Sequence, residues 1–141
     1  MGGFGTPAYG RETVLGRVRG PAYAMMAIAG LGMLQYFALI GLHILGMGAG
    51  IAGAHGHSDD AVGALLGGTI GIIWSGAGIV VNIVIVLGAL SMARGGSYIF
   101  SWVAAVLTFI PCFSGCCCAG FAVGLWAGFV LADDTVRSAF A

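Results

Sequence analysis

Lysine is absent from this chain, and charged residues of any kind are rare: five arginines and five acidic residues make up 7% of 141 positions. A soluble domain carries charge on about a quarter of its residues. The scarcity therefore excludes an ordinary soluble domain, and a formal net charge of zero argues against nucleic acid as a partner. No phosphate-binding loop, zinc-protease motif or nucleophile elbow is present, so we expect no enzymatic activity.

Apolar residues make up 60% of the chain, with 27 glycines and a mean hydropathy of +1.05. The uncharged runs, separated by short polar or Gly-rich connections, predict an all-α integral membrane protein, a four-helix bundle of two hairpins. We place the spans at about 21–50, 61–92, 98–113 and 115–132 in one domain, 21–141, which follows a Gly/Arg/aromatic arm, 1–20. Pro21 suits the first turn of the first helix.

The arginines predict the orientation of the bundle. With four spans, all five arginines fall on the side of the N-terminus, and the two opposite connections contain none. Because cytoplasmic loops are enriched in Lys and Arg, we expect both termini to be cytoplasmic.

Two glycine ladders with a spacing of four residues occur in the second and fourth runs. Such spacing places glycines on one helix face and lets another helix approach closely, which drives packing in lipid. The predicted helix-packing residues are Gly63, Gly67, Gly71, Gly120, Gly124 and Gly128.

Four polar residues fall within the first two runs: Gln35, His43, Thr69 and Asn82. Lipid penalises such groups, so each should face the bundle. Counting from a turn near 53–56 places His43 level with Thr69, and Gln35 near Trp74 or Ser75, as expected hydrogen-bonding neighbours. Two interpretations stay open, interhelical hydrogen bonding and a polar path through a small channel or transporter-like protein.

Histidines and cysteines gather at the outer connections of the predicted topology. Imidazole and thiolate bind zinc or copper, so His55, His57, Asp59, Cys112 and Cys116 are weak candidate metal ligands. No C-x-x-C pair is present, however, and adjacent cysteines cannot all point at one ion. We therefore predict no metal site and no cofactor. The cysteines serve as small packing residues or, in an oxidising compartment, form a disulfide.

The last third of the chain resembles an uncharacterised family of small bacterial membrane proteins, which ends in a Pro-Cys/Cys-Cys turn, a Gly-x-x-x-Gly-x-Trp helix and a Val-x-x-Ala-Phe tail. Gly128 and Asp133-Asp134 depart from the pattern. The resemblance implies no assigned activity and no catalytic residue. It is carried by Ser97-Tyr98, Ile110-Pro111-Cys112, Cys116-Cys117-Cys118, Gly120, Gly124-Leu125-Trp126-Ala127, Val130-Leu131, Val136 and Ala139-Phe140.

Together these features predict a non-catalytic structural or accessory subunit. The expected partners are the lipid bilayer and, through glycine-rich helix faces, copies of the chain or other membrane subunits. The expected location is the bacterial inner membrane. Alternatives are the channel or transporter-like protein and, more weakly, an outward-facing metal-handling or redox protein.

Overall fold

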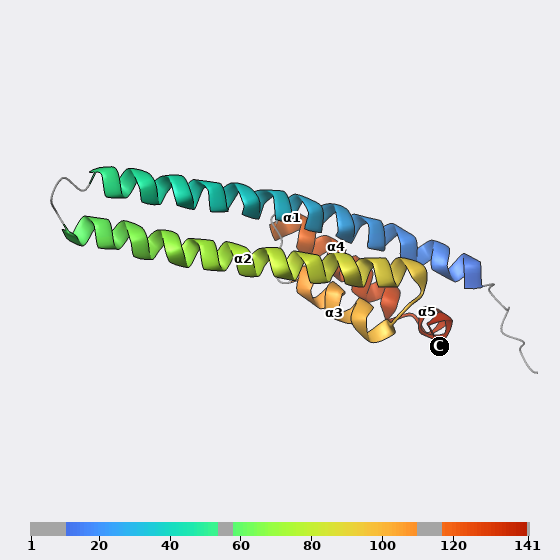
Figure 1. The fold of residues 1–141 in the computed structure, drawn as a ribbon. Helices are drawn as coiled ribbons and strands as arrows, with labels where there is room; N and C mark the ends of the chain where they lie inside the picture. Colours follow the sequence, from blue (N-terminus) through green and yellow to red (C-terminus); the bar gives the residue numbers. More distant parts are fainter. Residues whose placement is uncertain (1–10, 54–57, 110–116, 141) are drawn as a thin grey trace, which may run out of the picture.

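The computed structural model describes residues 11–53, 58–109 and 117–140, and every element within them is helical. The helices are α1 (Arg11–Gly53), α2 (Ser58–Arg94), α3 (Tyr98–Phe109), α4 (Cys117–Leu131) and α5 (Asp134–Ala139). At 1.5 Å per residue, α1 and α2 are about 64 and 55 Å long, whereas α3 and α4 are only about 18 and 22 Å. Figure 1 shows a long α1–α2 hairpin with the shorter helices beside one half of it.

Two of these helices, from Gly16 to Gly53 and from Ser58 to Arg94, are long and apolar enough to cross a membrane. The all-helical class expected from the sequence is confirmed for the described residues. Helices α3 and α4 are apolar but shorter than the runs 98–113 and 115–132, and shorter than the roughly 20 residues that a span takes. Residues 110–116, which connect them, lie outside the described residues.

Helix α1 begins at Arg11, ten residues before Pro21, which lies inside the helix. The expectation that Pro21 opens the first helix was therefore wrong. Val14 and Val18 extend the buried face of α1 by two turns and belong to the same apolar cluster as Val136 of α5. Burial in this cluster stabilises the helix on both sides of Pro21. The proline itself disrupts helical hydrogen bonding in one turn only. Residues 1–10 of the predicted arm lie outside the described residues.

The α1–α2 contact consists of bulky side chains of one helix seated on glycines of the other. A Cβ added to Gly78 would meet the ring of Tyr36, and one added to Gly32 would meet the amide of Asn82. Apart from Gly88, on which α3 packs, the buried positions on α2 recur after one step of seven residues and then at alternating steps of three and four. This is the heptad spacing of a left-handed helix pair with interlocking side chains. The sequence of α2 from position 68 to 92 follows it at Gly68, Ser75, Gly78, Asn82, Ile85, Ala89 and Met92.

The half of the hairpin that carries the termini also contacts the short helices. Helix α3 packs on α2, α4 packs on α3 and on α1, and α5 contacts α1. A Cβ on Gly88 would overlap the Cβ of Ala104 and lie 3.0 Å from the carbonyl oxygen of Phe100, so α2 and α3 touch there through their backbones. Helix α3 ends at Phe109, five residues after Ala104. Because α3 runs antiparallel to α2, its end lies level with about Ile83, five residues before Gly88.

We call residues 11–31 and 83–94, together with α3, α4 and α5, the basal part, and residues 32–53 and 58–82 the distal part. The distal part of α2 has 25 residues and is about 37 Å long. Figure 1 shows it extending well past α3 and α4. Its side chains are apolar and exposed on the outer faces of both helices; Leu45 is 71% and Ile73 67% exposed.

The turn from α2 to α3 explains how the chain reverses with three residues. Gly95 has φ 66°, a left-handed conformation that favours glycine. The Gly96 N–H donates to Ser91 O at 2.8 Å and the Gly95 N–H to Met92 O at 3.2 Å, the two bonds of a Schellman cap. The hydroxyl of Tyr98 then donates to Leu131 O at 3.0 Å. This bond ties the start of α3 to the end of α4.

Candidate functional site

A groove of about 350 Å³ lies between α1 and α2 in the distal part. We call it the distal groove. On the α2 side, the groove is lined only by glycines and one alanine. A Cβ added to Gly63 or Gly67 would meet no atom within 4 Å. The same holds for Gly46 on α1. The lining residues are Leu42, His43, Gly46, Met47, Gly63, Ala64, Gly67 and Gly68.

His43 is the one ionisable side chain that lines this groove. It is half-buried, and its Nδ1 lies 2.7 Å from the carbonyl oxygen of Leu39. Because a carbonyl only accepts, Nδ1 carries the proton and donates. The far edge of the ring, with Nε2, lies against Gly71, where a Cβ would overlap it.

The four polar residues of the first two runs are not brought together. Gln35 and Thr69 are exposed, and the Thr69 hydroxyl donates to Leu65 O at 2.7 Å. Asn82 is buried and donates from Nδ2 to Gly78 O at 2.8 Å. His43 faces Gly71, not Thr69, so the expected hydrogen bond between these two side chains was wrong. The hydrogen bonds from His43 to Leu39, from Thr69 to Leu65 and from Asn82 to Gly78 each stay within one helix.

The predicted glycine ladders divide into two kinds of position. Gly71 lies against His43, and a Cβ on Gly124 would lie 2.8 and 2.9 Å from the backbone N and Cα of Phe109. Gly63, Gly67 and Gly128 meet no atom within 4 Å. Gly120 is buried. Some glycines thus serve contacts within the chain, and others leave open surface.

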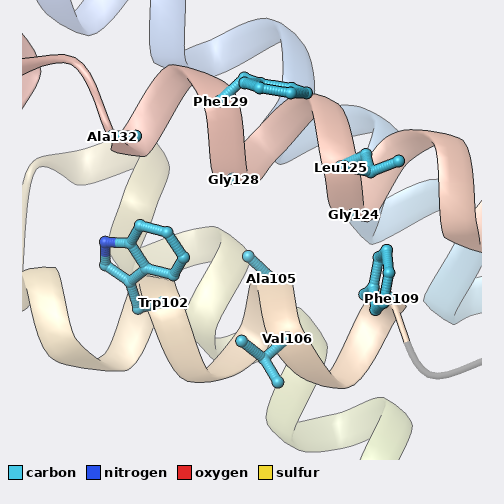
Figure 2. Close-up of a pocket in the computed structure, with 9 residues that line it drawn as sticks. All are labelled: Trp102, Ala105, Val106, Phe109, Gly124, Leu125, Gly128, Phe129 and Ala132. Carbon is cyan, nitrogen blue, oxygen red and sulfur yellow. The ribbon is translucent and has the colours of Figure 1, made fainter.

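A second groove, of about 310 Å³, lies between α3 and α4. Figure 2 shows Trp102 and Phe109 toward its two ends on α3, with Gly124 and Gly128 on the facing side of α4. The indole nitrogen of Trp102 is the only polar side-chain atom among its lining residues. The groove therefore suits an apolar occupant, and it offers no group for acid, base or nucleophilic chemistry. The remaining lining residues are Ala105, Val106, Leu125, Phe129 and Ala132.

Of the candidate metal ligands, only Asp59 falls within the described residues, and it is exposed at the start of α2. His55, His57, Cys112 and Cys116 lie outside them. Within residues 11–53, 58–109 and 117–140, no three His, Cys, Asp or Glu side chains gather closely enough to hold an ion. Cys118, at the start of α4, is an exposed free thiol.

Most of the charged residues lie at the basal end; Asp59 and Asp60, at the start of α2, do not. Asp133 caps α5, and its carboxylate accepts from the Thr135 hydroxyl at 2.7 Å and from the Thr135 N–H at 2.9 Å. These two hydrogen bonds, and secondarily the positive charge of Arg17, lower the pKa of Asp133 below its ordinary value. They favour the charged form, because an ionised carboxylate accepts such bonds better than a protonated one.

Acid is expected to fray α5. Because the folded-state pKa of Asp133 is depressed, the cap stabilises α5 fully above the ordinary pKa of 3.8, and the stabilisation is lost as pH falls through the depressed value. Amide hydrogen exchange in 134–139, corrected for intrinsic rates, should therefore accelerate as pH falls from 3.8 through the depressed pKa of Asp133. Asp133→Asn should abolish this extra acceleration. If Asp133→Asn and the unaltered chain show the same pH dependence, the cap does not control α5.

Comparison with known protein families, with curated proteins and with solved structures finds no match to this chain.

Proposed function

We propose that the chain is a non-catalytic integral membrane protein that packs through a glycine-rich helix face against copies of itself or against other membrane subunits. In this proposal it lies in the bacterial inner membrane with both termini in the cytoplasm. The basal position of Arg17, Arg19, Arg94 and Arg137 supports the orientation, because α1 begins, α2 ends and α5 lies at that end.

The observation that carries the proposal is a continuous face of the α1–α2 hairpin. Residues seven apart lie on nearly the same face of a supercoiled helix. Gly67 is three heptads from Gly88, the glycine on which α3 packs.

The face of α2 that α3 covers in the basal part thus continues into the distal part, to the groove that it shares with Gly46 of α1, where nothing in the described chain covers it. It carries the same kind of small residue there: Gly46, Gly63 and Gly67 leave open space where a helix could approach. In lipid, close backbone approach at small residues is the main source of helix association. A helix of another chain is the natural occupant of such a face.

The length of the apolar surface supports the same proposal. No charged residue occurs between Arg19 and Asp59, nor between Asp60 and Arg94. At 1.5 Å per residue, the helical parts of these runs, 20–53 and 61–93, each span about 50 Å, against about 30 Å of hydrocarbon. A tilt of about 40°, at the upper end of the observed range, leaves a projection of about 38 Å along the membrane normal. The excess apolar surface needs a protein partner to cover it.

Gly67→Leu tests the proposal directly. The Cβ of the new side chain would meet no atom within 4 Å, and the rest of it would occupy the distal groove, so the monomer should stay helical while assembly is lost. Gly76→Leu is the matched control, because Gly76 is equally open but lies on the other flank of α2. The measurement is the mass of the protein released from native membranes in mild detergent. Equal assembly of the two variants would contradict the proposed face.

A further inference from the structure

We propose that His43 and Met47 form a binding site for a soft monovalent metal ion, Cu(I), in the distal groove. The two residues are four apart on α1, so their side chains are neighbours on one helix face. Both line the groove, and both are directed at glycines of α2. The site differs from the histidines, cysteines and aspartates of the two outer connections.

The imidazole is oriented as a metal-binding ring. Its Nδ1–H donates to Leu39 O at 2.7 Å, which leaves the lone pair of the neutral ring on Nε2. A metal-ligating histidine almost always donates its second ring N–H to a carbonyl or carboxylate in this way. The ring makes no other hydrogen bond within the described residues, so Nε2 is available as a ligand.

The thioether of Met47 supplies the second donor. Its sulfur lies against Gly68, and the His43 ring lies against Gly71, one turn further along α2. Positions three apart on a helix have Cβ atoms about 5–6 Å apart. The two donor atoms therefore meet the same short stretch of α2 wall. Gly67, which also lines the groove, adds no side chain to this part of the α2 wall.

The donor set selects the ion. Thioether sulfur is a soft ligand that favours Cu(I), and imidazole binds copper as well. The groove lining contains no carboxylate, whereas hard divalent ions take oxygen ligands. An apolar surrounding also penalises a double charge more than a single one. A neutral nitrogen and a neutral sulfur thus fit a monovalent ion better than Zn²⁺ or Mg²⁺.

The site occupies the same groove as the proposed packing face but does not depend on that role. Metal binding is measured on the purified protein, and assembly is measured by mass. Either one can therefore fail without the other.

The test is anaerobic titration of the full-length protein in detergent with Cu(I), against a chromophoric chelator. All four cysteines are replaced by serine, so that no thiolate competes. This parent should bind one Cu(I) per chain, with nitrogen and sulfur ligands in its X-ray absorption spectrum. Met47→Leu, which nearly keeps the side-chain volume, and His43→Gln should each weaken binding at least 10–100-fold, roughly the loss caused even by removing outer-shell partners.

Two controls separate this site from the rest of the chain. Met33→Leu removes a thioether elsewhere on α1, and the pair His55→Asn with His57→Asn removes the imidazoles of the connection; both proteins should bind Cu(I) like the parent. The proposal is overturned if the parent binds no Cu(I) in competition with the chelator. It is also overturned if Met47→Leu or His43→Gln binds as tightly as the parent, or if either control loses the ion.

Discussion

Gly124→Leu is expected to separate α4 from α3 and to destabilise the basal part by about 2 kcal/mol. A Cβ at this position already lies 2.8 and 2.9 Å from backbone atoms of Phe109, which cannot move without shifting α3. Overpacking of this kind costs up to about 3 kcal/mol, and replacing a helical glycine by a better helix former returns about 1 kcal/mol. The measurement is reversible unfolding in mixed micelles, followed by circular dichroism.

Gly128→Leu is the matched control on the same helix. Its Cβ meets nothing within 4 Å and enters the open α3–α4 groove, so only the gain in helix propensity remains. This variant should be as stable as the unaltered protein or slightly more stable. If Gly124→Leu and Gly128→Leu unfold alike, the close α3–α4 contact at Phe109 does not exist in the protein.

Gly88→Leu is expected to have an effect of similar size on the contact between α2 and α3. A Cβ there would overlap that of Ala104 and lie 3.0 Å from the carbonyl oxygen of Phe100. Because both helices meet through their backbones, we expect a net loss of about 2 kcal/mol, again the overpacking cost less the propensity gain. Amide hydrogen exchange in α3 should accelerate by more than tenfold.

The control for this change is Gly76→Leu, in which the same substitution is made on α2 at a position with open space. It should leave exchange in α3 unchanged. Slow exchange in α3 of the Gly88→Leu variant would mean that α3 does not depend on this contact.

Helix content was predictable because the uncharged runs are long, and charges mark most of their ends. The start of α1 was not predictable from local signals, because Pro21 resembles a helix start. The decisive feature, the burial of Val14 and Val18 in one apolar cluster with Val136 of α5, joins opposite ends of the chain.

The glycine ladders were recognisable, but the facing residues were not. Four residues advance a helix by about 400°, so each step of four moves about 40° around the axis. Gly63 and Gly67 therefore lie on the flank of α2 when Gly71 is at the contact line. The actual contacts mostly follow alternating steps of three and four residues, and the position at which the chain reverses sets which residues of α1 and α2 face each other. A turn near 53–56 predicts Thr69 as the neighbour of His43, whereas the actual turn lies slightly later and places Gly71 there.

The C-terminal residues that resemble the bacterial membrane family have a physical use in this chain. The Tyr98 hydroxyl bonds Leu131 O, and its ring packs edge-to-face on Phe140 at 5.8 Å between centroids. Ala127, Leu131 and Val136 are almost fully buried in the basal core. These residues close the basal part, so a shared pattern would preserve a fold and would not by itself indicate a reaction.

The most direct test of the proposed packing role is native mass spectrometry of the protein extracted from its own membrane in mild detergent. We predict a complex of defined stoichiometry, built from several copies of the 14.2 kDa chain or from this chain and other membrane subunits. Gly67→Leu should reduce it to the single chain, and Gly76→Leu should leave it intact. A single chain released from the unaltered membrane under the mildest conditions would contradict the account.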